Sequence, residues 1–385
     1  MTSPGEGPSA GDVTAAGFEY ELPPERIAQH PAAEREAARL MLVARGVAAP
    51  PFDSVVRDLP GHLRAGDLLV VNRSRVFPAR LRGRRVPEGG AVELLLVAPG
   101  AAPAPGGDAS EVGERWRVLA RPARRLRVGQ RIALLDARDG ADAADAGGAG
   151  GASSPREVVV EVSGRGDGWL EIALPAGVRA IDLAERIGET PLPPYIRRPD
   201  GPTEEDASRY QTVYAREPGS IAAPTAGLHL TESLFGRLAE MRVATAEVVL
   251  HVGPATFLAG QPGRDALAVE PERYEVPRAT REAIARTRAS GEGRVIAVGT
   301  TTTRALESAA RAGWPEGLVE TSLVLGPGSR FEVVQGLLTN FHLPGSSLLA
   351  LVAAFAGVET ARRAYEAAIA RGYRFYSYGD AMLVL

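Results

Sequence analysis

The sequence of 385 residues contains neither cysteine nor lysine. Without cysteine the chain forms no disulfide, no thiolate metal site and no cysteine nucleophile, which fits a reducing cytoplasm. All 44 basic residues are arginine. This excludes a Schiff-base lysine and the phosphate-binding lysine of P-loop proteins. A composition rich in alanine, glycine and arginine accounts for the missing lysine.

Long apolar runs are missing as well. The longest, LLALVAAFAGV near residue 350, is too short to cross a bilayer and predicts a buried helix. Residues 1–17 lack the basic and apolar regions of a signal peptide and predict a disordered tail. With 45% hydrophobic residues and a net charge of −3, we expect a cytoplasmic globular protein. It is expected to bind no membrane and, most simply, to be a monomer.

Short apolar segments separated by glycine and proline turns occupy residues 66–176. Such spacing predicts a small antiparallel β-barrel. Two low-complexity stretches, 99–113 and 137–155, predict mobile loops within it. The segments expected to be strands are GDLLVVN, RVFPARLRG, AVELLLVA, RWRVLARP, QRIALL, REVVVEVSG and GWLEIAL.

Helical periodicity alternates with apolar strands in residues 18–65 and 177–385. The expected strands include ATAEVVLHVG, RVIAVG, SLVLGPG and FEVVQGLL, and the expected helices include TESLFGRLAEM, ATREAIARTRAS and TRALESAARAG. This alternation favours a sheet covered by helices. The predicted fold is therefore an α/β main domain with an inserted small antiparallel β-barrel.

Three histidines lie beside glycine, proline or threonine where two elements meet. They are His229 in AAPTAGLHLT, His251 in VVLHVGPATF and His342 in TNFHLPGSS. Because α/β folds place ligands at strand ends, all three are candidates for chemistry. Each could instead cap a turn. A three-histidine zinc site is a further alternative, but neither close spacing nor a partnered carboxylate accompanies it, so no metal is expected.

The stretch RVIAVGTTTTRALESAARAG predicts a strand that ends at Gly299 and a helix that follows. Backbone N–H groups at Thr300 and Thr301, with Arg304 one turn later, could bind a phosphate or carboxylate. The alternative is that one of the threonines simply caps the helix.

Two arginine runs, 73–86 and 115–131, contain no acidic residue. Arg80, Arg82 and Arg84 alternate, so they can line one face of a strand. This asymmetry indicates contact with a nucleic-acid backbone, and a merely solvated face is the alternative. In PLPPYIRRPD, Tyr195 beside two arginines could stack on a base, or the segment could be a stiff connector.

A series of long motifs runs in one order from Phe18 to the C-terminus. On these motifs the chain resembles the S-adenosylmethionine:tRNA ribosyltransferase-isomerases of queuosine biosynthesis, the QueA family. The motifs are FEYELPPERIAQHP, GDLLVVNRSRVFPARL, PLPPYI, RYQTVYA, AAPTAGLHLT, LHVGPATF, RVIAVGTTTTRALES, LTNFHLPGSSLLALVAAFAG and YRFYSYGDAML.

The resemblance implies both an architecture and a reaction. The fold would be an α/β domain with an inserted barrel. The ribosyl part of S-adenosylmethionine, a co-substrate, would be transferred to a 7-aminomethyl-7-deazaguanine base in the tRNA anticodon loop. Isomerisation would give epoxyqueuosine, with release of adenine and methionine.

That chemistry requires particular groups. A base must remove a proton beside the sulfonium, and the departing adenine needs a proton or hydrogen bonds. The methionine carboxylate needs cationic or N–H donors. The catalytic candidates are His229, His251, His342, Glu272 and Asp380. The substrate-binding candidates are Arg80, Tyr195, Tyr210, Gln211, Thr225, Gly227, Gly299, Thr300, Thr301, Arg304, Asn340 and Tyr378.

The chain departs from the family pattern after LHVGPATF. The family has His-x-Met-His-x-Glu there, whereas this chain has Leu267 and Glu270 in place of the histidines and keeps Glu272. Gln335 replaces an aspartate before TNFHLP. If the site is retuned, we expect Glu270, Gln335 and the three histidines to converge on one pocket.

Two functions remain open at this stage. One is a working ribosyltransferase-isomerase. The other is a divergent relative that keeps the fold but binds a nucleoside or RNA without this reaction, or acts on another acceptor. The motifs TAGLH, GTT-x-R, TNFHLP and YSYGDAM favour the first.

Overall fold

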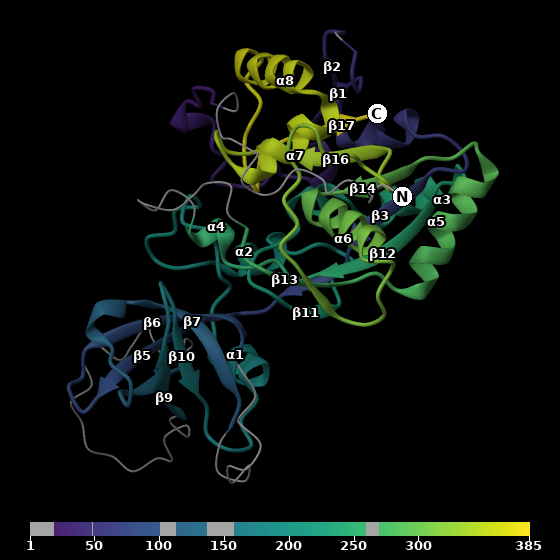
Figure 1. Cartoon of the computed structure of the whole chain (residues 1–385). Helices are drawn as coiled ribbons and strands as arrows, with labels where there is room; N and C mark the ends of the chain where they lie inside the picture. Colours follow the sequence, from purple (N-terminus) through teal and green to yellow (C-terminus); the bar gives the residue numbers. More distant parts are fainter. Residues whose placement is uncertain (1–18, 48, 101–112, 137–157, 259–268) are drawn as a thin grey trace.

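The computed structural model describes residues 19–47, 49–100, 113–136, 158–258 and 269–385 (Figure 1). The predicted tail, nearly all of the two low-complexity stretches and Leu267 therefore lie outside the described residues.

A nine-stranded mixed sheet forms the main body. Its strand order is β15-β13-β12-β3-β14-β16-β17-β1-β2. The four central strands, β12, β3, β14 and β16, run parallel to one another. In the order of the sheet the strands are Val319–Thr321, Glu272–Glu275, Ala244–Leu250, Leu68–Asn72, Val295–Val298, Gly336–Asn340, Ala381–Val384, Arg39–Val43 and Phe52–Val55.

Side chains alternate between the two faces of this sheet, and each face packs into its own core. Leu68 and Val70 belong to one cluster, and Leu69 and Val71 to the other. Helices α5 (Arg278–Ser290), α6 (Thr300–Arg311), α7 (Ser347–Ala356) and α8 (Val358–Ala370) supply the first cluster, and α3 (Glu232–Glu240) the second. Both faces are thus covered, which explains why the central strands are continuous apolar runs.

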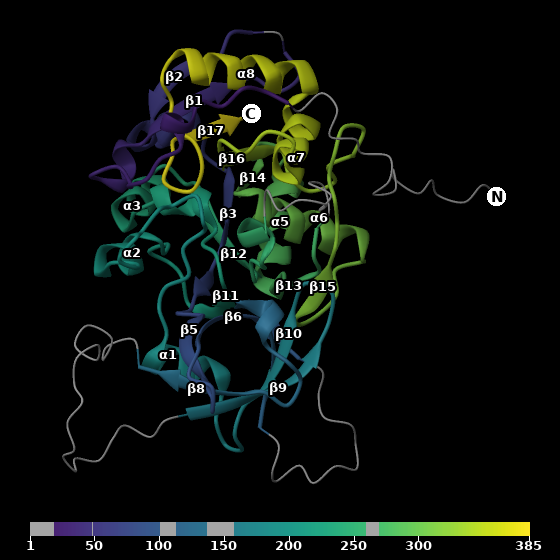
Figure 2. The same cartoon turned by 90° about the vertical axis from the view of Figure 1, so that its left-hand side faces the viewer.

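The inserted unit is a closed antiparallel barrel of strand order β10-β7-β6-β5-β8-β9. In both views it lies below the sheet, on the side of β13 and β11 (Glu217–Ser220) (Figures 1 and 2). Helix α1 (Ala180–Ile187) packs on the barrel core. In chain order the barrel strands are Arg80–Val86, Ala91–Pro99, Arg115–Arg121, Arg131–Leu135, Val158–Arg165 and Leu170–Ala173. The predicted fold class is confirmed.

Three predicted strands differ from the structure. GDLLVVN, expected in the barrel, is β3 at the centre of the main sheet because it is buried on both faces. SLVLGPG forms no strand, and β15 ends just before it at Thr321. FEVV is irregular because the buried Glu307 carboxylate accepts backbone N–H bonds from Glu332, Val333 and Val334. The domain boundaries at 66–176 remain a prediction.

A chain connection, an ion pair and a packing contact hold the barrel at one edge of the sheet. The chain leaves the carboxyl end of β3 and passes through β4 (Ser74–Val76), which pairs with β11, into β5. Arg75 pairs with Glu185 of α1 at 2.6 Å. Phe257 of α4 (Ala255–Leu258), which follows β12, packs against the barrel core. The barrel therefore stands at the edge formed by the carboxyl ends of the parallel strands.

Within the described ranges no helix is long and apolar enough to cross a membrane. The apolar run near residue 350 forms α7, which is buried as predicted.

Candidate active site

A cavity of about 520 Å³ opens at the carboxyl edge of the parallel strands. Its walls come from the segments that follow β12, β14 and β16. This is the edge at which open α/β sheets bind ligands. Predicted site residues that line it are Tyr195, Tyr210, Thr225, Glu272, Gly299, Thr300, Thr301, Arg304, Asn340 and His342.

The N-terminus of α6 faces this cavity through Gly299, Thr300 and Thr301. Gly299 adopts a φ of 92°, in which a side chain would be strained, and this turns the chain from β14 into α6. No side chain caps the helix, because the cap position is Gly299, and Thr302 and Thr303 bond back to the carbonyls of Val298 and Gly299. The capping alternative is therefore wrong, and the first N–H groups of α6 remain available to an anion.

Arg304 and Glu272 form a buried ion pair on the cavity wall, and each residue is only 6% exposed. Glu272 also accepts the N–H of Gly253 at 2.9 Å, which holds the turn after β12 in place. Arg304 Nε donates to the carbonyl of Leu323 at 3.0 Å. Arg304 Nη2 is buried and has no hydrogen-bond partner among the described residues. One donor of this guanidinium is therefore left for a ligand.

His342 is the predicted histidine that lines the cavity. Its Nε2 lies 2.7 Å from Thr339 Oγ1, and its backbone N–H donates to Tyr365 Oη at 3.0 Å. Burial lowers the pKa of His342 to about 4. The imidazole is therefore neutral near pH 7 and can accept a proton.

Aromatic side chains form another part of the wall. Tyr195 and Tyr376 both line the cavity, and their ring centroids lie 4.4 Å apart. Tyr195 Oη is 2.7 Å from Ser377 Oγ. Tyr210 is 1% exposed, and burial raises its pKa to about 12. Flat aromatic rings can hold a planar base.

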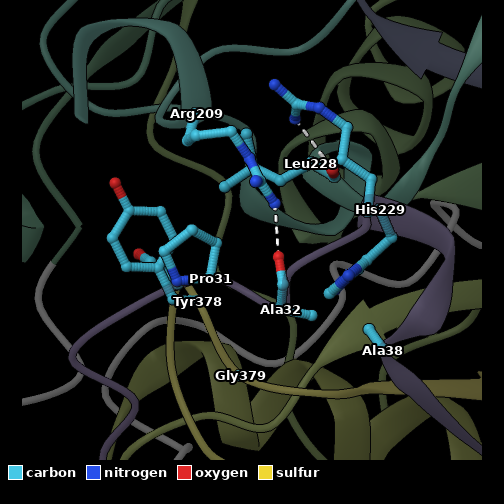
Figure 3. A pocket seen from close by; sticks show the side chains of 10 residues that line it. Pro31, Ala32, Ala38, Arg209, Leu228, His229, Tyr378 and Gly379 are labelled. Carbon is cyan, nitrogen blue, oxygen red and sulfur yellow. Dashed lines mark hydrogen bonds between the residues drawn. The ribbon is translucent and has the colours of Figure 1, made fainter. Parts of the chain in front are cut away.

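His229 does not line the large cavity. It lines a separate hollow of about 20 Å³ with Arg209, Leu228 and Tyr378, which Figure 3 shows around it. Its Nε2 lies 3.3 Å from Asn340 Nδ2, so it stands behind a residue that does line the cavity. Burial lowers the pKa of His229 to about 4.

His251 also lies outside the cavity wall. It follows β12, and its Nδ1 is 2.8 Å from Ser74 Oγ, which in turn lies 2.6 Å from Ser220 Oγ. Burial and the nearby Arg273 lower the pKa of His251 to about 4. A Cβ on Gly219 would lie 2.6 Å from its Nδ1, so Gly219 makes room for the ring. His251 joins β12 to the β4–β11 pair.

Five other predicted residues form contacts away from the cavity. Asp380 accepts the backbone N–H groups of Arg39 and Arg374 at 3.0 and 2.8 Å. The Gln211 amide bonds both backbone groups of Val76. The remaining three are Tyr378, which donates to Asp206, Gly227, which packs against Tyr214, and Arg80, which donates to the carbonyl of Leu192.

The expected convergence on one pocket is only partly found. Glu270 and His342 line the cavity, but His229 and His251 do not. Gln335 pairs with the backbone of Val295 at the other end of β14 and β16, so its charge change cannot compensate for Glu270. In the described part of the chain, no three metal-ligating side chains gather.

Sequence reasoning missed several cavity residues. They lie inside motifs that were recognised, but nothing in the sequence showed that these positions of the motifs reach the cavity. Ser346 caps α7 by accepting the N–H of Leu349 at 3.2 Å, so a second helix N-terminus also reaches the wall. The others that matter here are Gly253, Thr339, Ser347, Tyr376 and Ser377.

Comparisons with known proteins agree on one family. The model of a family described as queuosine biosynthesis protein matches residues 15–384. Similar curated proteins include S-adenosylmethionine:tRNA ribosyltransferase-isomerases from Nostoc sp. and Thermus thermophilus. They are 42% and 46% identical over 97% and 96% of this chain, and over 92% and 98% of their own length.

A solved structure is similar over nearly the whole chain. It is the crystal structure of S-adenosylmethionine tRNA ribosyltransferase from Thermotoga maritima, with a TM-score of 0.51 and 33% sequence identity. The match covers 96% of this chain and 100% of that one.

Proposed function

The chain belongs to the queuosine biosynthesis protein family, and we propose that its large cavity is where S-adenosylmethionine binds and reacts. The protein transfers and isomerises the ribosyl moiety of S-adenosylmethionine onto the 7-aminomethyl-7-deazaguanine base of tRNA. The products are epoxyqueuosine-tRNA, adenine and methionine. Nothing in the described geometry favours a binding protein without turnover.

One observation supports this use of the cavity above the others. The unpartnered Arg304 Nη2 and the uncapped N-terminus of α6 belong to the same cavity wall. A guanidinium and free N–H groups together suit a carboxylate, which forms charge-assisted hydrogen bonds with both. In S-adenosylmethionine that group is the methionine carboxylate. The cavity volume of about 520 Å³ is in the range of sites for ligands of this size.

Deprotonation beside the sulfonium is assigned to His342. It is neutral near pH 7 because burial lowers its pKa, and Thr339 orients its ring. Sulfonium charge acidifies the neighbouring carbon, and a neutral imidazole can accept the proton that leaves it. Tyr195 and Tyr376 offer ring faces for the adenine or the acceptor base.

The tRNA is assigned to the barrel. Several arginines of the two runs are already neutralised: Arg82 pairs with Glu189 at 2.6 Å, and Arg115 with Glu171 at 3.7 Å. Those in the β7–β8 connection differ. Arg124, Arg125 and Arg127 are exposed and form no ion pair in the part of the chain that is described. Unpaired guanidiniums on a surface attract phosphates.

The test of the function is adenine release. Purified protein, S-adenosylmethionine and tRNA carrying the 7-aminomethyl-7-deazaguanine base should release adenine and form epoxyqueuosine. Reactions without protein or with tRNA lacking that base give the background. Adenine release no higher than this background would refute the function, and binding without turnover would support the divergent-relative alternative.

A further inference from the structure

The amide of Asn340 has a fixed orientation. Its Nδ2 donates to the carbonyl oxygen of Tyr376 at 3.0 Å, and this oxygen can only accept. The nitrogen must therefore face Tyr376, and the oxygen must face the other way. Asn340 is 1% exposed and lines the large cavity. Its Oδ1 is buried and has no partner among the described residues.

His229 is the second contact of this amide. Its Nε2 lies 3.3 Å from Asn340 Nδ2, which has two hydrogens and no lone pair. Nε2 must therefore be the acceptor, so the imidazole is neutral with its proton on Nδ1. Burial of the ring, which is 5% exposed, favours the same neutral form. A protonated His229 would place two donors face to face.

We propose that His229 is a positioning residue: it fixes the Asn340 amide so that Oδ1 faces the cavity as an acceptor for an N–H donor of S-adenosylmethionine. The inference rests on the proposed function, because it assumes which molecule fills the cavity. A buried acceptor without a partner costs free energy unless a ligand satisfies it.

The sheet register indicates which donor reaches this acceptor. Val298 and Leu338 are partners in the β14–β16 ladder. Asn340 and Thr300 each lie two residues further along, so they stand at the same level at the carboxyl edge. The α-ammonium of an amino acid lies next to its carboxylate. With the carboxylate at the N-terminus of α6, the ammonium is the nearer donor, and the 6-amino group of adenine is the more distant one.

The test compares S-adenosylmethionine with two analogues, one lacking the α-amino group and one lacking the 6-amino group. Adenine or purine release with the precursor-bearing tRNA gives kcat/KM for each. In the unaltered protein, kcat/KM for the analogue that lacks the donor to Asn340 should be roughly tenfold or more below kcat/KM for S-adenosylmethionine. Within each variant, kcat/KM for S-adenosylmethionine is divided by kcat/KM for the analogue. A reduced amount of folded protein affects both values equally and cancels from this ratio.

Asn340→Ala should bring this ratio close to one, because the acceptor is removed. His229→Leu should lower it towards one, because the amide is then held by the Tyr376 carbonyl alone. His229→Gln should keep the ratio of the unaltered protein, because its side-chain oxygen also accepts from Nδ2. His62→Gln, at a histidine that bonds Ser54 away from the cavity, is the matched control and should keep it too.

The proposal is overturned if Asn340→Ala and His229→Leu keep the ratio of the unaltered protein, or if neither analogue loses activity in the unaltered protein. A loss confined to the 6-amino analogue supports the acceptor role and assigns it to the adenine. Absence of adenine release by the unaltered protein refutes the proposed function itself, which separates the two failures.

Discussion

Glu272 and Arg304 are the residues in which stability and binding are most closely linked. The Glu272 carboxylate holds both the guanidinium of Arg304 and the N–H of Gly253. Breaking such a buried pair leaves one charge uncompensated and costs about 3–5 kcal/mol, whereas replacing both partners is often nearly neutral. A single substitution at this pair therefore affects folding and binding at once.

Arg304→Met should raise the KM for S-adenosylmethionine at least tenfold, because the carboxylate loses its cation. Steady-state adenine release measures this. The double variant Arg304→Met with Glu272→Gln removes the uncompensated charge and should still show the raised KM, which separates binding from folding. Arg286→Gln, an exposed arginine on α5, is the control. An unchanged KM in the double variant would contradict the assignment.

Gly227 is required for packing rather than for contact with substrate. A Cβ added to it would lie 1.9 Å from Tyr214 Oη. Gly227→Ala should lower the free energy of unfolding by about 1–3 kcal/mol through overpacking. Gly236→Ala, at a position in α3 with open space around the Cβ, should raise it by about 0.5–1 kcal/mol. Urea unfolding measures both changes in the free energy of unfolding. Equal changes for the two substitutions would show that the structure moves to accommodate a Cβ beside Tyr214.

The motifs in the sequence identified these residues, but they could not show in which direction each side chain points. TAGLH, HVG and TNFHLP each placed a histidine at an element junction, yet only His342 lines the cavity. His251 turns towards Ser74 and His229 towards Asn340. Which way a side chain points from a strand end depends on distant neighbours, and these are not adjacent in the sequence.

At the scale of elements, strands buried on both faces were predictable, but the segments between them were not. RVIAVG and ATAEVVLHVG contain β14 and β12, whose apolar runs are paired on both sides within the sheet. In FEVVQGLL the strand begins only at Gly336. The carboxylate of Glu307, 25 or more residues earlier, binds the preceding N–H groups. A side chain from α6 thus overrides a local β preference.

The β7–β8 connection is the element whose charge can be removed without touching the cavity. Replacing Arg124, Arg125 and Arg127 with glutamine should weaken tRNA binding. It should also reduce the slope of log affinity against log salt by roughly 0.7–0.9 for each phosphate that is no longer bound. Filter binding across a salt series measures this. Arg362 and Arg363 of α8, already paired with Glu359, are the control substitutions. An unchanged slope would place the RNA elsewhere.

For the whole molecule, buried neutral histidines predict acid sensitivity. Burial holds the pKa of His229, His251 and His342 at about 4, although Asp380 opposes this at His229 while Arg374, Arg35 and, at His251, Arg273 reinforce it. All three histidines protonate in the unfolded chain near pH 6.5. As pH falls from about 6.5 to 4 the unfolded state binds up to three more protons, so stability is lost there.

The free energy of unfolding should fall by up to roughly 1.4 kcal/mol per pH unit for each of the three histidines over this range. Urea unfolding at pH 7, 6 and 5 measures it. His229→Gln and His251→Gln should each remove about a third of the slope, whereas His30→Gln, at an exposed position, should leave it intact. The carboxyls with lowered pKa, such as Asp67, act below this window. A slope unaffected by both substitutions would mean that other groups control acid sensitivity.

The architecture as a whole was accessible from sequence because alternation, periodicity and long motifs pointed to the same answer. The point at which the barrel begins was harder to predict. We assigned β3 to the barrel because this strand begins the run of short apolar segments, but it lies between β12 and β14 in the main sheet. Pairing partners far apart in the chain are not encoded in local pattern.

The position of β17 has a consequence for how the protein is made. This strand, Ala381–Val384, lies between β16 and β1, so a strand made long after β1 and β2 joins them to the rest of the sheet. On the ribosome the barrel can close while translation continues, since its strands are contiguous in the message. The main sheet must wait until β17 has been made. A stop codon placed before Ala381 would thus leave a finished barrel attached to an open sheet that proteases and chaperones would recognise.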